Sequence, residues 1–121
     1  MQENKITGVN MDAGLDLYDE EMDIYLSVMK SFVTNAPAVL EKLRNVTAES
    51  LPGYIINVHG MKSMSAAIAA EEISDKAKKL ELMAKAGDLS GVQYENEAFV
   101  EQVKALITNV QSWLAKNEAN F

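Results

Sequence analysis

The sequence predicts an all-α fold, an antiparallel up-and-down four-helix bundle with an additional short N-terminal helix. Apolar residues recur every three or four positions over several long segments, which is the period of a helix that buries one face. The 121 residues include only six glycines and two prolines, which suits long helices. The turns between the segments are short, and short turns favour antiparallel neighbours. We therefore expect residues 1–121 to form a single helical-bundle domain.

The composition limits the classes of function and environment. The formal net charge is −7, so the phosphates of nucleic acids and anionic membranes would repel the protein, and we expect neither as a partner. The chain has no cysteine, hence no disulfide and no thiolate metal site, which suits a reducing compartment. The first residues carry neither a basic segment nor an apolar run, so we expect no leader, and no stretch approaches the ~20 apolar residues of a membrane span. We expect a cytoplasmic monomer without a metal site.

Residues 1–10 are expected to form a loose lead-in. Asn10 can cap a short helix over residues 11–17, because its side chain can accept a hydrogen bond from the first turn. A longer helix is expected over about residues 19–34, since acidic side chains fill its first turn, where the helix dipole favours them. The apolar positions that this helix would bury are Met22, Tyr25, Leu26, Met29, Phe32 and Val33.

A break is predicted at Asn35-Ala36-Pro37. Asparagine is a good cap and proline is favoured in the first turn of a helix, so a separate helix is expected over about residues 36–46. The buried face of this helix would consist of Val39, Leu40 and Leu43. Ser50, closely followed by a proline and a glycine, then predicts the start of the next helix.

Two further helices are expected in the second half of the chain. The first covers about residues 71–86 and ends at Gly87, which suits a left-handed cap. The second covers about residues 91–117. The first would bury Ile73, Ala77, Leu80 and Met83 or Ala84. The second would bury Phe99, Val103, Leu106, Val110 and Trp113 or Leu114.

His59, the only histidine of the chain, lies in the helix that starts near Ser50. It points about 130° away from the centre of that helix's apolar stripe, hence toward solvent. The stripe consists of Leu51, Tyr54, Val58, Met61, Ser65 and Ile68, with Ile55 at its edge. The face around His59 carries small or uncharged residues, namely Ile56, Gly60, Ser63, Ala66, Ala67 and Ala70. Lys62 lies between the apolar stripe and His59, so the histidine would have one ammonium group beside it.

Composition and spacing leave the role of His59 open. A lone histidine on a helix most often has no special role, and a face of small residues is most often a contact between helices. The run His59-Gly60-Met61-Lys62-Ser63, however, resembles the H-x-[LM]-K-[GS] signature of histidine-containing phosphotransfer (HPt) domains. These four-helix modules pass a phosphoryl group between receiver domains in phosphorelays.

The resemblance extends over most of the chain. Residues Ser65–Ala70 are similar to the family's S-A-x-x-[LI]-G-A, and Leu80-Glu81 with Gly87-Asp88 are similar to its L-E-x-x-x-x-x-G-D. The family's opening region resembles Ile6–Asn10, Leu15 and Tyr25–Phe32. Two positions depart from the pattern. Ser63 stands where glycine is commonest, and Ala69 replaces the usual second glycine, which puts the choice of partner in doubt.

The resemblance implies a phosphorelay protein in which His59 accepts the phosphoryl group. It implies that Lys62 offsets phosphate charge and that Ser63 donates a hydrogen bond to a phosphate oxygen. The partners would be receiver domains of hybrid histidine kinases and of response regulators, and these would dock on Ile56, Gly60, Ala66 and Ala67. The domain would need no cofactor of its own, because the receiver would bring the Mg²⁺.

Other functions are weaker hypotheses. A sensor kinase would carry H-E-x-x-x-P and an ATP-binding domain, whereas glycine follows His59 and the chain is short. A diiron bundle needs Glu-x-x-His motifs, and Ile56 holds the place of that glutamate. The main alternative is a bundle of the same fold that only binds proteins, with an idle histidine. Another is the phosphoaccepting module of a chemotaxis-type kinase. We expect a phosphocarrier without kinase activity of its own.

Overall fold

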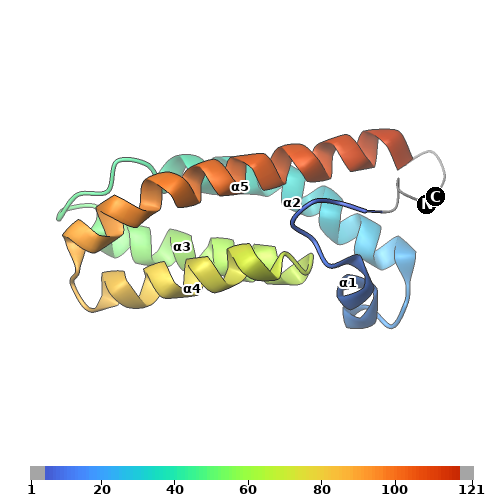
Figure 1. Cartoon of the computed structure of the whole chain (residues 1–121), viewed down its shortest axis with the longest axis horizontal. Helices are drawn as coiled ribbons and strands as arrows, with labels where there is room; N and C mark the ends of the chain where they lie inside the picture. The colour runs from blue at the N-terminus through green and yellow to red at the C-terminus, as the bar shows by residue number, and fades with distance from the viewer. Residues whose placement is uncertain (1–4, 118–121) are drawn as a thin grey trace.

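The computed structural model describes residues 5–117, and this part of the chain consists of helices and connecting turns (Figure 1). The helices are α1 (Met11–Leu17), α2 (Met22–Lys42), α3 (Leu51–Ala67), α4 (Glu71–Lys85) and α5 (Leu89–Asn117). In Figure 1, successive long helices run in opposite directions, and α1 lies across one end of the bundle. Each of the four long helices contacts two of the others, in the order α2, α3, α4, α5 and back to α2. The four-helix bundle with a short N-terminal helix is therefore confirmed.

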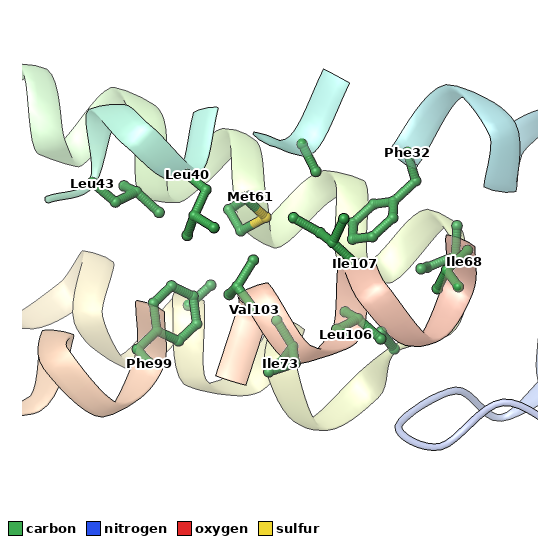
Figure 2. Packing of buried hydrophobic residues seen from close by; sticks show 14 of the residues in the cluster. Phe32, Leu40, Leu43, Met61, Ile68, Ile73, Phe99, Val103, Leu106 and Ile107 are labelled. Carbon is green, nitrogen blue, oxygen red and sulfur yellow. The ribbon is translucent and has the colours of Figure 1, made fainter. Parts of the chain in front are cut away.

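The four long helices enclose one apolar core, because the stripe of each helix faces the bundle axis. Figure 2 shows side chains of all four helices meeting there, among them Phe32, Met61, Ile73 and Val103. The central residues predicted for the stripe of α3, from Tyr54 to Ile68, are buried, while Leu51 at its start and Ile55 at its edge are half-buried. The side of α3 opposite to this stripe is therefore turned outward.

The predicted break at Asn35-Ala36-Pro37 is wrong, because α2 continues from Met22 to Lys42 with Pro37 inside it. Phe32, Ala36 and Leu40 are spaced four residues apart, and all three are buried on the same face. A proline inside a helix costs about 3 kcal/mol, since it removes one backbone hydrogen bond and crowds the preceding turn. Burial of the continuous stripe outweighs this cost, so tertiary packing overrides the local signal.

Two helix starts also differ from the predictions. Asp19 and Glu20 have φ angles of 55° and 65° and form a left-handed turn, so α2 begins at Met22 and not at residue 19. The last helix begins at Leu89, two residues earlier than predicted. The end of α4 agrees with the prediction: Gly87 has a φ of 80°, and the N–H of Asp88 donates to the carbonyl of Met83 at 3.0 Å.

The carboxyl end of α3 is held by the N-terminal part of the chain. The hydroxyl of Tyr18 donates to the carbonyl of Ala67 at 2.6 Å, and the hydroxyl of Tyr25 donates to the carbonyl of Ile68 at 2.9 Å. The N–H of Asn10 donates to the carbonyl of Ala69 at 3.0 Å. The last carbonyls of a helix lack partners inside the helix. Tyrosines and the start of α1 supply these partners, which fixes the end of the helix that carries His59.

The described part of the predicted lead-in packs on the bundle, although the sequence suggested a loose segment. Ile6 is buried in the core, and the carbonyl of Thr7 accepts a hydrogen bond from Nδ2 of Asn109 at 3.3 Å. Asn10 caps α1 as predicted, because its Oδ1 accepts from the N–H of Ala13 at 3.1 Å. Residues 1–4 lie outside the described part of the chain.

Candidate functional site

His59 lies midway along α3, on the side opposite to the buried stripe. Its side chain is 56% exposed, whereas Val58 and Met61 beside it are fully buried. The histidine is therefore not a core residue. The predicted accessible position on a helix is confirmed.

A buried carboxylate orients the imidazole. Nδ1 of His59 lies 2.8 Å from Oε2 of Glu81, which comes from α4 and has a side chain only 5% exposed. An ionised carboxylate can only accept, so Nδ1 carries the proton and donates it. In the neutral ring the other nitrogen, Nε2, keeps its lone pair, and the hydrogen bond that His59 makes within residues 5–117 is through Nδ1. The neutral imidazole therefore has a free nitrogen that can act as a nucleophile.

Two lysines complete the surroundings of Glu81. Nζ of Lys62, on α3, donates to Oε1 at 3.0 Å, and Nζ of Lys85, on α4, lies 3.2 Å from Oε2. Burial by itself raises the pKa of Glu81, but the hydrogen bonds from Lys62, His59 and Lys85 outweigh burial and lower this pKa to about 2. Glu81 is therefore ionised throughout the physiological range of pH. One carboxylate with three donors links α3 to α4 at the position of the histidine.

The sequence alone assigns no role to Glu81, beyond its part in the family resemblance, and none to Lys85. The available signal was the place of Glu81 on α4, next to the buried positions Leu80 and Ala84, where a charged side chain needs a partner. The identity of that partner depends on how α3 and α4 align, and the spacing of residues within one helix does not predict this alignment.

The other predicted site residues lie around His59 on the outer face of α3. Ser63 and Ala66 are exposed, and Ala67 is half-buried. Ile56 is 72% exposed, although it is a large apolar residue. A Cβ added at Gly60 would meet no atom within 4 Å, so the space above this glycine is open. Ala70, in contrast, is fully buried beyond the end of α3, and its predicted place on the outer face is wrong.

Two further helices border this face. Leu82 of α4 follows Glu81 directly and is 57% exposed, so a second large apolar side chain lies on the surface of the helix beside α3. Beside Ala66, a cavity of about 230 Å³ is lined by residues of α1, α3 and α4, among them Leu17 and Ser74. The face around His59 is therefore a broad, weakly apolar surface, open enough for another protein to approach.

The fold and the site define a class of protein, namely a helical bundle with one accessible imidazole held by a buried carboxylate. A family model described as Hpt domain matches residues 27–113, which is most of the chain and includes α3, α4 and most of α2 and α5. The chain therefore belongs to the Hpt domain family, whose members take part in histidine phosphotransfer. The family resemblance found in the sequence is confirmed. Comparisons with curated proteins and with solved structures gave no match.

The described part of the chain shows neither a candidate metal site nor a helix that could span a membrane. Among residues 5–117, no three histidine, cysteine, aspartate or glutamate side chains are grouped so that they could hold a metal ion. No helix in this part of the chain is long and apolar enough to cross a membrane.

Proposed function

We propose that the protein relays a phosphoryl group between the aspartates of receiver domains, with His59 as the phosphoacceptor. The observation that carries this proposal is the hydrogen bond of 2.8 Å between Nδ1 of His59 and the buried carboxylate of Glu81. It fixes the proton on Nδ1 and leaves Nε2 as the attacking atom. An imidazole on a surface without a role would not need a buried, ionised partner.

The transfer can then proceed without moving a proton. Nε2 attacks the phosphorus of an aspartyl phosphate, the N–P bond forms, and the O–P bond breaks with its electron pair left on the aspartate. The ring becomes a phosphorylated imidazolium whose positive charge Glu81 stabilises through the proton on Nδ1. In the reverse step the N–P bond breaks, its electron pair returns to Nε2, and the neutral ring is restored. The same residues therefore serve both directions.

Lys62 and Ser63 are proposed to assist at the phosphoryl oxygens. Lys62 lies one turn from His59, and its ammonium can offset the charge that phosphoryl transfer places on these oxygens. Ser63 is exposed at the fourth residue after His59, on the same side of α3, and its hydroxyl can donate to the same group. The Mg²⁺ that such a transfer uses would be bound by the receiver, so the domain supplies no metal of its own.

The partner surface is proposed to be the face around His59. Ile56 and Leu82 offer apolar contact, while Gly60, Ala66 and Ala67 let the receiver bring its aspartate close to the ring. Both the receiver of a hybrid histidine kinase and that of a response regulator would use this surface in turn. We propose that the protein works as a monomer in the cytoplasm, where a chain without cysteine suits the reducing conditions.

The proposal is tested by transfer from a receiver domain labelled with radioactive acetyl phosphate. We expect label on the protein that acid removes and base does not, because a phosphoramidate has this stability. His59→Gln is the control, since glutamine keeps the approximate size and loses the nucleophile, and its far-UV circular dichroism should match the wild type. Label on His59→Gln would move the site elsewhere, and no label from any receiver would favour a protein-binding bundle with an idle histidine.

A parallel reaction uses a kinase domain with ATP as the donor in place of the receiver. Label from the kinase alone would assign the protein to the chemotaxis-type modules. Label from a receiver, returned to a second receiver, is the result that the relay predicts.

A further inference from the structure

Lys85 shares an atom with the histidine. Oε2 of Glu81 is 2.8 Å from Nδ1 of His59 and 3.2 Å from Nζ of Lys85, while Lys62 contacts the other oxygen, Oε1. The ammonium of Lys85 therefore lies beside the imidazole, although this lysine comes from the last turn of another helix. It lies outside the five-residue histidine motif and outside the face of α3.

The charges at this site do not balance while the ring is neutral. Two ammonium groups face one carboxylate, so the group formed by His59, Glu81, Lys62 and Lys85 has one positive charge in excess. A phosphohistidine with a proton on Nδ1 combines an imidazolium with a phosphoryl dianion, and it carries one net negative charge. The site becomes neutral when His59 is phosphorylated, and it does so only because Lys85 is present.

We propose that Lys85 is a positioning residue that stabilises the phosphorylated form of His59 by acting through Oε2 of Glu81. Lys85 limits the repulsion between Glu81 and the phosphoryl group, and it leaves Lys62 available to turn toward the phosphoryl oxygens. This inference rests on the proposed function, because it assumes that His59 carries the phosphoryl group. Lys85 then helps to set the lifetime of the phosphoryl group on His59.

The test uses phosphoramidate, a small donor that needs no partner protein. Nε2 attacks its phosphorus, the N–P bond to the ring forms, and the donor's P–N bond breaks to release ammonia. His59 is the only histidine, so ³¹P NMR follows one phosphohistidine per molecule. The half-life of this signal after removal of the donor is measured at pH 8, in low salt and in 1 M salt.

Lys85→Met should shorten the half-life about two- to fivefold in low salt, since ion pairs of exposed lysines are weak but measurable. The loss should shrink in 1 M salt, where the Debye length is about 3 Å. Lys85→Arg keeps the charge and should restore the wild-type half-life. Lys79→Met is the matched control, because Lys79 lies on the same helix at similar exposure and pairs with Glu95 instead. It should behave as the wild type.

A double variant tests the route of the effect. In a Glu81→Gln background, Lys85→Met should change the half-life little, because the carboxylate through which Lys85 acts is gone. Equal half-lives of Lys85→Met and the wild type would overturn the inference, and so would an equal loss with Lys79→Met or an undiminished loss in the Glu81→Gln background.

The outcomes separate this inference from the relay itself. If receivers fail to label the protein while Lys85→Met still shortens the half-life, the relay is wrong and the role of Lys85 stands. If receivers label the protein and the half-lives are equal, the relay stands and the role of Lys85 is wrong. A wild-type His59 that phosphoramidate cannot label would overturn both.

Discussion

Replacing Glu81 by glutamine tests the mechanism most directly, because it keeps the shape of the side chain and removes its charge. Oε2 of Glu81 faces Nδ1 of His59 and Nζ of Lys85, and Oε1 faces Nζ of Lys62, so donors occupy both oxygens. The amide nitrogen of the glutamine must replace either Oε2, which faces His59 and Lys85, or Oε1, which faces Lys62. If it points at Nδ1 it donates there, the ring proton moves to Nε2, and the attacking lone pair is lost. If it points at Lys62, two donors face each other.

The size of the effect follows from the type of hydrogen bond that is lost. A hydrogen bond to a charged group contributes about 1.5–3 kcal/mol, against about 1 kcal/mol for a neutral pair. The charged bond matters most in the transition state, where the ring becomes positive. Replacing the charged bond by a neutral one loses about 0.5–2 kcal/mol at this point, which lowers the rate of transfer roughly two- to thirtyfold. We expect Glu81→Gln to fall in this range while it still accepts some phosphate.

The assay is rapid-quench transfer from a phosphorylated receiver, supported by the ring ¹⁵N shifts of His59, which report the nitrogen that holds the proton. The wild type should show the proton on Nδ1 at pH 7.5. A Glu81→Gln protein that transfers at the wild-type rate would refute the reasoning that the carboxylate prepares the ring for attack.

The same substitution has a consequence for stability that depends on pH. The pKa of Glu81 is lowered to about 2 in the folded protein, so its ionisation stabilises the fold above the usual glutamate pKa of 4.5. This contribution is lost as the pH falls from 4.5 toward 2. The difference in free energy of unfolding between the wild type and Glu81→Gln should therefore be largest near pH 7 and shrink across that window, as urea unfolding at several pH values can measure. A constant difference from pH 7 to 3 would contradict the lowered pKa.

Three further substitutions test the face of α3 and its end. Lys62→Ala should slow transfer about two- to fivefold at low salt, with a smaller loss at high salt, because a partly exposed ammonium only screens phosphate charge; a rate unchanged at low salt would remove this role. Gly60→Arg should abolish transfer and leave the melting temperature unchanged or higher, since a side chain there meets open space and glycine is the poorer helix former by up to ~1 kcal/mol. Ala105→Arg, exposed on α5, is its control and should transfer normally, whereas a sharp loss of stability in Gly60→Arg would show that the face is packed. Ala69→Gly should raise the free energy of unfolding by up to about 1 kcal/mol, because Ala69 has a φ of 64°, a left-handed conformation that costs alanine about 1–2 kcal/mol. Ala77→Gly, at a buried position inside α4, should lower it, and equal losses in the two variants would refute the strain.

The sequence alone was sufficient to predict those features that depend only on residues close together in the chain. The end of α4 was predicted because Gly87 can adopt the left-handed conformation that the cap requires. The exposure of His59 followed from the spacing of Val58, Met61 and Ser65, which fixes the buried side of α3. These features depend on residues within one or two helical turns of each other.

The missed features depend on contacts between helices. Pro37 is a sound local signal for a helix start, but Ala36 and Leu40 pack into the core and keep α2 continuous. Glu81 is twenty-two residues from His59, and their hydrogen bond exists only because α3 and α4 align as they do. Ala69 was identified as a departure from the family pattern, but the left-handed backbone that explains the usual glycine needed the structure.

The hydrogen bonds that hold the carboxyl end of α3 come from residues outside the part of the chain that the family model matches. The family model begins at residue 27, whereas the groups that hold the end of the histidine helix come from Asn10, Tyr18 and Tyr25. Gly14 also takes part in this arrangement, because any Cβ there would collide with the ring of Tyr25. A fragment cut at the boundary of the match would keep His59 and the five-residue histidine motif, yet expose three carbonyl groups at the end of its helix. The boundary of the family match and the boundary set by these hydrogen bonds therefore differ in this protein by about one short helix and its turn.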